Sequence, residues 1–257
     1  GGQTNRVGSG GNSFPGNGAH HAKKNELKPW LKEEWCIPPQ ANAAFVCAME
    51  DVLEIYHQPY DPQRPMVCFD EGSRQQTKET RRPLPTRPGD VAKYDYEYER
   101  NGTSNVFMFF APLEKWRHVK VTARRTMLDF AECMRDLVDI HFPEAEKIVL
   151  VMDNLNTHKF ASLYEAFPPA EARRIIEKLE IHYTPKHGSW LNMAEIELSV
   201  LQRQCLKARI PDRATMIEKV AAWEQARNSS SATVHWRFTT ADARIRLHKL
   251  YPSIDVC

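Results

Sequence analysis

The sequence has 257 residues, of which 42% are hydrophobic and 26% are charged, as in an ordinary globular protein with a sizeable core. Its formal net charge of +2 neither requires nor excludes a nucleic acid partner. The chain has no apolar run long enough to span a membrane, no signal-peptide pattern and no zinc-like spacing among its six cysteines, so we expect a cytoplasmic protein.

The first 22 residues differ in composition from the rest of the chain. They hold seven of the 11 glycines, few apolar residues and no periodicity, so we expect a disordered leader. Residues 23–64 predict a proline-marked connector and then a helix over Asn42–His57, where apolar residues recur every three or four positions. Residues 65–252 predict one larger domain, and residues 253–257 a tail.

Strands come first in the larger domain. Residues 66–69 form a short apolar strand that runs into Asp70. The polar, basic and proline-rich segment 73–103 predicts a long loop or a hairpin arm. Two further strands follow, at 105–113 and 116–121.

Helices and strands alternate in the remainder. A helix is expected over 126–142, where Thr126 and Asp129 look like a capping pair. The later elements are strands at 148–152 and 179–183 and helices at 191–207 and 213–228. This order predicts an α/β fold in which helices flank a mixed sheet.

Two carboxylates close strands that are apolar enough to be central. Asp70 ends the first strand, and Asp153, followed by Asn154, ends the strand at 148–152. Sheets of this class place their chemistry where strands end, so both are candidate site residues. Aspartate also commonly ends a strand as a turn former or a helix cap, which is the alternative for each.

A third candidate lies on the helix at 191–207. Its expected buried face contains Leu191, Ala194, Leu198, Leu201 and Cys205. Glu195 and Glu197 fall on opposite flanks of this face, and the spacing does not choose between them. Three carboxylates from two strands and a helix can hold two Mg²⁺ ions for phosphodiester chemistry. No glycine-rich phosphate loop is present.

Five segments in order, VCFDEGSRQQ, YDYEYERNGTSNVFMFF, WRHVKVTARRT, VMDNLNTH and YTPKHGSWLNMAEIELSVL, closely resemble the DDE transposases of bacterial insertion sequences in the mariner superfamily. The resemblance covers about Lys23 to Pro252. It implies a ribonuclease-H-like fold and cut-and-paste DNA transposition, with target joining at TA. It also implies two Mg²⁺ or Mn²⁺ ions held by Asp70, Asp153 and Glu195, with Glu197 as the fallback. Met193 stands where members often have proline, a mild departure.

The same resemblance implies double-stranded DNA as partner, a homodimer in the DNA complex and a bacterial, nucleoid-associated location. Basic and aromatic residues near the carboxylates are candidate DNA contacts: Arg74, Arg81, Arg82, Lys186, His187, Trp190 and Arg203. Asn154 and His158 are candidates for orienting water or phosphate. Charged runs are also typical of a solvated surface, and Trp190 is equally consistent with a core position.

The resemblance also implies helix-turn-helix modules before the catalytic domain, and none is visible. One permissible coding of residues 16–25, read with one base dropped, gives Glu-Thr-Val-Arg-Thr-Thr-Leu-Lys-Lys, similar to the end of a recognition helix. We hypothesise that residues 1–22 are an out-of-frame translation. Two other interpretations stay open: a different ribonuclease-H-like nuclease, such as an integrase or resolvase, and a truncated, non-catalytic remnant that binds DNA or inhibits the full-length enzyme.

Overall fold

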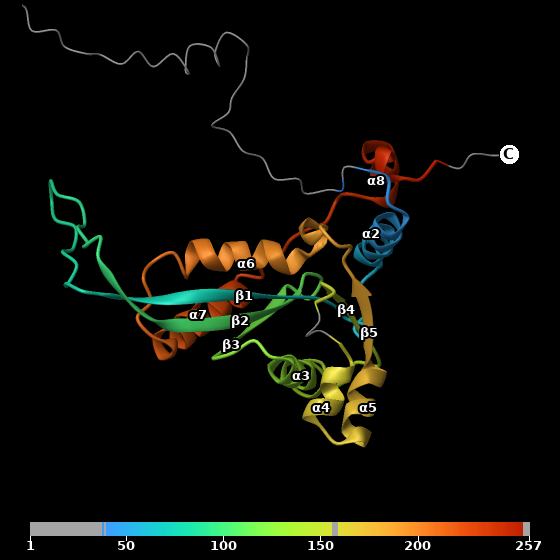
Figure 1. Cartoon of the computed structure of the whole chain (residues 1–257), viewed down its shortest axis with the longest axis horizontal. Coiled ribbons are helices and arrows are strands. Elements are labelled where there is room, and N and C mark those ends of the chain that lie inside the picture. Colours follow the sequence, from blue (N-terminus) through green and yellow to red (C-terminus); the bar gives the residue numbers. More distant parts are fainter. Residues whose placement is uncertain (1–37, 39, 156–158, 254–257) are drawn as a thin grey trace, which may run out of the picture. The chain divides into compact units, whose positions relative to one another are not determined.

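The computed structural model describes residues 38, 40–155 and 159–253 (Figure 1). Its helices and helical turns are α2 (Ala43–Tyr56), α3 (Met127–Asp136), η1 (Leu137–His141), α4 (Ala161–Ala166), α5 (Pro169–Lys178), η2 (Ser189–Leu191), α6 (Met193–Gln204), α7 (Arg213–Ser229), α8 (Thr240–Arg246) and η3 (His248–Leu250). Its strands are β1 (Met66–Glu79), β2 (Tyr98–Ala111), β3 (Trp116–Thr122), β4 (Ile148–Met152) and β5 (Leu179–Tyr183). The leader for which we expected disorder and an out-of-frame origin lies outside the described residues, as does His158.

The strands form one mixed sheet in the order β3-β2-β1-β4-β5. β1, β2 and β3 pair antiparallel, whereas β4 and β5 continue the sheet in parallel with β1. Helices cover both faces of this sheet, which confirms the predicted α/β architecture (Figure 1). None of the helices in the described ranges is long and apolar enough to cross a membrane.

Alternating side chains divide the sheet between two cores. Met66 and Cys68 of β1 face one core with Val149 and Val151 of β4, and this core is covered by α2, α6 and α7. The intervening residues of both strands, such as Phe69, face a second core beneath α3, α4 and α5. Helix α2, expected within a connector, therefore packs directly on the sheet.

β1 and β2 are longer than the predicted strands. They pair from Cys68↔Phe110 out to Glu79↔Tyr98, with a register shift between Gln75 and Thr77. Segment 73–103 is therefore a hairpin arm. The outer halves of its strands are polar and largely exposed, so they lack the alternation of buried and exposed residues from which a strand is predicted. The prediction that Asp70 ends its strand is wrong. Asp70 lies inside β1, because the pairing of β1 with β2 continues after its pairing with β4 stops.

Helix ends follow local capping chemistry. Thr126 and Asp129 form the predicted capping box, since each side chain bonds the backbone N–H of the other residue. The helix expected over 126–142 is α3 followed by the π-helical turn η1. α6 is capped by Asn192, whose side-chain oxygen accepts a hydrogen bond from the Ala194 amide at 3.0 Å.

Candidate active site

Asp70 and Asp153 occupy equivalent positions on the adjacent parallel strands β1 and β4. The last parallel pair is Cys68↔Val151, and each aspartate lies two residues further along the chain, Asp70 within β1 and Asp153 directly after β4. Because side chains alternate along a strand, Asp70 shares the face of Cys68 and Asp153 that of Val151. Both therefore lie at the rim of the core that α6 covers.

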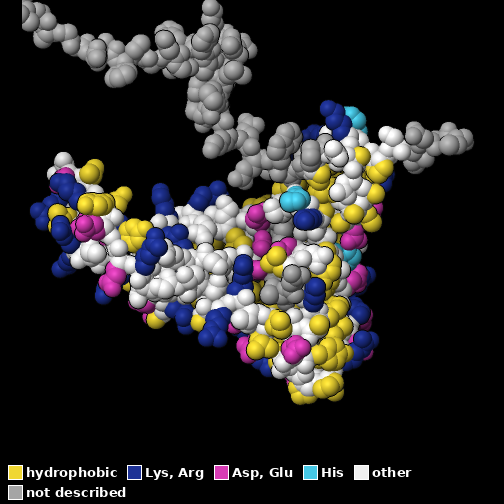
Figure 2. Space-filling view, in the orientation of Figure 1, with side chains coloured by type: hydrophobic (Ala, Val, Ile, Leu, Met, Phe, Trp, Pro, Cys, Tyr) yellow, Lys and Arg dark blue, Asp and Glu magenta, His cyan; other side chains and the backbone are white. Residues whose placement is uncertain are grey.

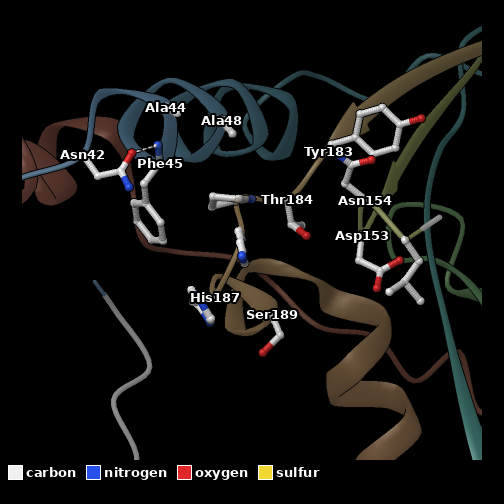
Figure 3. Close-up of a pocket in the computed structure, with 13 residues that line it drawn as sticks. Asn42, Ala44, Phe45, Ala48, Asp153, Asn154, Tyr183, Thr184, His187 and Ser189 are labelled. Carbon is white, nitrogen blue, oxygen red and sulfur yellow. Dashed lines mark hydrogen bonds between the residues drawn. The ribbon is translucent and has the colours of Figure 1, made fainter. Parts of the chain in front are cut away.

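Glu195 reaches the same rim from the first turn of α6. The Asn192 side-chain amide before this turn donates a hydrogen bond at 2.8 Å to the backbone carbonyl of Phe69, the residue preceding Asp70. The Glu195 carboxylate is exposed, in contrast to its buried neighbour Ala194. In Figure 3 the Asp153 carboxylate also points toward α6.

The environment of Asp70 combines burial with three neighbouring carboxylates. Burial raises the pKa of Asp70 to about 7, although the Glu71 amide donates to its carboxylate at 2.8 Å. The negative charges of Asp153, Glu71 and Glu195 raise this pKa further. Figure 2 shows acidic side chains gathered over the amino-terminal end of α6. Such a gathering of like charges favours a bound cation.

The three candidate residues are chemically suited to a hard divalent cation, because all three carry carboxylate oxygens and the rim is partly open to water. Among the described residues, however, no group of three or more histidine, cysteine, aspartate or glutamate side chains is arranged so that it could hold a metal ion.

Glu197, the fallback ligand, lies in a different environment. It is fully buried, and its carboxylate accepts hydrogen bonds from Arg227 at 2.9 and 3.0 Å. Arg117 Nε, also fully buried, lies 2.9 Å from the same carboxylate. The predicted flank position of Glu197 is therefore wrong. The buried face of α6 runs through this residue because two guanidinium groups neutralise its charge.

A cleft of about 820 Å³ adjoins Asp153 (Figure 3). Asn154, Lys186 and His187 line it together with residues of α2. The turn that carries Lys186 and His187 is tight: a side chain at Gly188 would bring its Cβ within 2.5 Å of Pro185. Three of the predicted phosphate-contacting or accessory residues thus lie beside Asp153 on a fixed turn or strand end.

The other predicted DNA contacts are scattered. Arg74 is half-buried on β1, and Arg203 is exposed on α6. Arg81 and Arg82 are exposed in the hairpin arm, which extends away from β4 (Figure 1). Trp190 is half-buried, with Trp236 and Phe238 at ring-centroid distances of 6.4 and 6.1 Å. This packing favours the core interpretation of Trp190.

Two residues that contact parts of the site, Glu71 and Tyr56, could not be recognised as such from the sequence. Glu71 is buried, and Arg125 Nη1 lies 3.3 Å from its carboxylate. The only available signal was its place directly after Asp70. Tyr56 reads as an apolar helix residue in the sequence, yet its hydroxyl donates a hydrogen bond at 2.6 Å to the Leu191 carbonyl beside α6.

Comparison with solved structures gives similar folds in the Mos1 mariner transposase. The Mos1 paired end complex with Mn matches with a TM-score of 0.53 and 12% identity, over 89% of this chain and 76% of that chain. The Mos1 paired end complex with Mg matches with a TM-score of 0.53 and 15% identity, over 91% of this chain and 71% of that chain. A pre-cleavage Mos1 transpososome matches with a TM-score of 0.52 and 12% identity, over 89% of this chain and 78% of that chain.

At these identities the likeness establishes a common fold, and it confirms the predicted ribonuclease-H-like architecture. No curated protein sequence matches this chain. Residues 65–217, more than half of the chain, match the family model described as DDE superfamily endonuclease. This range includes Asp70, Asp153 and Glu195. The chain therefore belongs to the DDE superfamily of endonucleases.

Proposed function

We propose that this chain is the catalytic domain of a DNA transposase, which hydrolyses phosphodiesters at transposon ends and joins the freed 3′ ends to target DNA. The observation that carries the proposal is the gathering of Asp70, Asp153 and Glu195 at one rim, in a chain of the DDE endonuclease family. Two aspartates on strands and a glutamate on an anchored helix give rigid positions from which to orient a phosphate.

Asp70 and Asp153 would hold Mg²⁺ or Mn²⁺, and Glu195 would complete the site. Two such ions, when bound, supply activation of the attacking oxygen and stabilisation of the leaving oxygen in an in-line displacement. The pKa of Asp70 is raised by burial and, to a smaller extent, by the neighbouring carboxylates, and a bound cation would offset both effects. The Mos1 paired end complexes with Mn and with Mg support the choice of metal.

DNA is the proposed substrate and partner. Lys186, His187 and Asn154 line the cleft beside Asp153, where they are placed to contact phosphates next to the scissile bond. Arg74 and Arg203, with Arg81 and Arg82 on the hairpin arm, would add contacts to the DNA backbone. From the resemblance we further propose a homodimer that pairs two ends and a TA dinucleotide as target.

Nicking of supercoiled plasmid with Mn²⁺ tests the chemistry. We expect the parent chain to nick, and Asp153→Asn or addition of a chelator to abolish nicking. Asp139→Asn is the matched control, since Asp139 is exposed and bonds Arg174 on the α5 side of the sheet. Equal nicking by all three proteins would contradict the proposed site. DNA binding without nicking by the parent would instead support the non-catalytic interpretation.

Strand transfer separates a transposase from another nuclease of the same fold. The substrate is a short duplex taken from the inverted repeat that flanks the gene, with a free 3′-hydroxyl and a label on the transferred strand. Covalent joining of the label to plasmid at TA sites supports the transposase proposal. Preferential cleavage of branched junctions, without joining, would point to a resolvase.

A further inference from the structure

The position of Glu195 depends on how the first turn of α6 is held. First-turn residues lack the preceding helical turn that holds those in a helix interior. Glu195 is exposed, so packing of its own side chain does not fix it. The contacts of residues 191–193, immediately before it, therefore decide where its carboxylate lies relative to Asp70 and Asp153.

The Tyr56 hydroxyl binds both sides of this short segment. It donates a hydrogen bond to the Leu191 carbonyl at 2.6 Å, and the Met193 amide donates to it at 3.4 Å. The same hydroxyl lies 3.6 Å from Cys68 Sγ on β1. One buried oxygen of α2 thus joins β1, two residues before Asp70, to the turn that precedes Glu195.

The Tyr56 hydroxyl is suited to a fixed structural bond. Its side chain is only 7% exposed, and its ring packs against Trp236 at a centroid distance of 5.1 Å. Burial raises the pKa of Tyr56 well above its ordinary value, so the hydroxyl keeps its proton and remains a donor to Leu191. Removal of this oxygen would leave the buried Leu191 carbonyl without that donor.

The segment has a second attachment, through Asn192. Its side-chain amide donates to the Phe69 carbonyl, and its side-chain oxygen caps α6. Further along α6, Glu197 binds Arg117 and Arg227 and fixes the rotation of the helix. Tyr56 differs from these residues because it lies in α2, before the residues 65–217 that match the family model.

We infer that Tyr56 is a positioning residue for the carboxylate site: its hydroxyl holds the start of α6 against β1 so that Glu195 faces Asp70 and Asp153. The inference deepens the proposed function and rests on it. Helix α2 is thereby part of the active-site scaffold, although none of its side chains is proposed to touch metal or DNA phosphate.

Tyr56→Phe tests the role, because it removes one oxygen and keeps the ring that packs on Trp236. Tyr251→Phe is the matched control: the Tyr251 hydroxyl also bonds α2, donating at 2.7 Å to Glu50, whose other partner is Arg244 and not a residue of the α6 turn. Mn²⁺ affinity is measured by titration calorimetry without DNA, and the half-saturating Mn²⁺ concentration is measured for plasmid nicking. Thermal unfolding in chelator reports the general loss of stability in each variant.

We expect Tyr56→Phe to weaken Mn²⁺ binding and to raise the half-saturating Mn²⁺ concentration by about tenfold, the size typical of residues that orient metal ligands. The maximal nicking rate at saturating Mn²⁺ should fall less. Tyr251→Phe should change neither metal property. Asn192→Ser, which retains an N-cap oxygen but shortens the arm to Phe69, should weaken Mn²⁺ binding in the same direction.

The outcomes separate the two proposals. Unchanged Mn²⁺ affinity in Tyr56→Phe, together with loss of binding in Asp153→Asn, overturns the positioning role and leaves the proposed site standing. Equal Mn²⁺ affinity in the parent and Asp153→Asn overturns the site and the positioning role with it. Equal weakening in Tyr56→Phe and Tyr251→Phe also overturns the positioning role, since it would reflect general loosening of α2.

Discussion

Two groups of acidic side chains lie on opposite sides of the first turns of α6, and they differ in what balances their charge. At the rim, burial raises the pKa of Asp70 to about 7, and the carboxylates around it act in the same direction. On the buried side, Glu197 faces the guanidinium groups of Arg117 and Arg227. The protein supplies its own cations where the charge is structural. At the rim it gathers negative charge, which suits a cation taken from solution.

Among the substitutions that test this difference between the rim and the buried side of α6, that of Glu195 should have the largest effect. Glu195→Gln should reduce metal-dependent nicking by about a thousandfold, because a catalytic metal contributes several kcal/mol to transition-state stabilisation. Its melting temperature should stay close to that of the parent, since the side chain is exposed. Rates from plasmid nicking and thermal unfolding measure the two effects. Retention of full activity would remove Glu195 from the site.

The matching substitution two residues later should have the opposite profile. Glu197→Gln leaves Arg117 and Arg227 without their carboxylate in a buried place, and should lower the free energy of unfolding by about 3–5 kcal/mol. Urea unfolding measures this loss. A stable Glu197→Gln protein that fails to bind metal would reverse the assignment of the two glutamates.

Stability of the metal-free chain should depend on pH through Asp70. Its pKa rises from 3.8 to about 7 on folding, so the folded chain keeps a proton that the unfolded chain releases. This contribution is fully present below pH 3.8 and is lost as pH rises through about 7. Asp70→Asn removes the charge and should stabilise the metal-free chain at about pH 8 by roughly 1–3 kcal/mol. Melting in chelator at about pH 5 and pH 8 compares the two proteins; a destabilised variant at the higher pH would contradict the expected repulsion.

The smallest effect is expected at the cleft. Lys186→Ala should weaken DNA binding modestly and equally for all sequences, and should reduce the slope of log affinity against log salt by about 1. Lys178→Ala on α5 serves as the control, because Lys178 bonds the Pro143 carbonyl on the other face of the sheet. Fluorescence anisotropy over a range of salt concentrations gives both slopes. An unchanged slope in the first variant would exclude a phosphate contact by Lys186.

The sequence predicted those features that depend on neighbouring residues. The strand at 148–152 and the central position of the strand that leads into Asp70 follow from local apolar patterns, and the Thr126–Asp129 cap follows from the spacing of two polar residues. That these two strands are neighbours in the sheet was not predicted. The environment of Glu197 could not be predicted, because its partner Arg117 lies on β3 and the other, Arg227, on α7. Periodicity treats a buried glutamate as a surface residue unless its partners are known.

The length of β1 was hidden for a related reason. Its outer half carries polar side chains that are stabilised by pairing with β2 and not by burial. The pattern of apolar residues therefore predicted only the first part of β1, which lies between the two cores. The role of Tyr56 was hidden as well, since a tyrosine on the apolar stripe of a helix shows nothing of where its hydroxyl points.

Continuity of β1 has a mechanical consequence. The strand that carries Asp70 runs on without interruption into the hairpin arm, so a load on the arm is transmitted along one backbone toward the site. The register shift between Gln75 and Thr77 lies between the two, and the Thr77 amide is tied there to the Ile210 carbonyl at 2.9 Å. An irregularity of this kind concentrates bending at one point. Bending at this point would leave the pairing of Asp70 with Met108 of β2, and of Cys68 with Val151 of β4, in place.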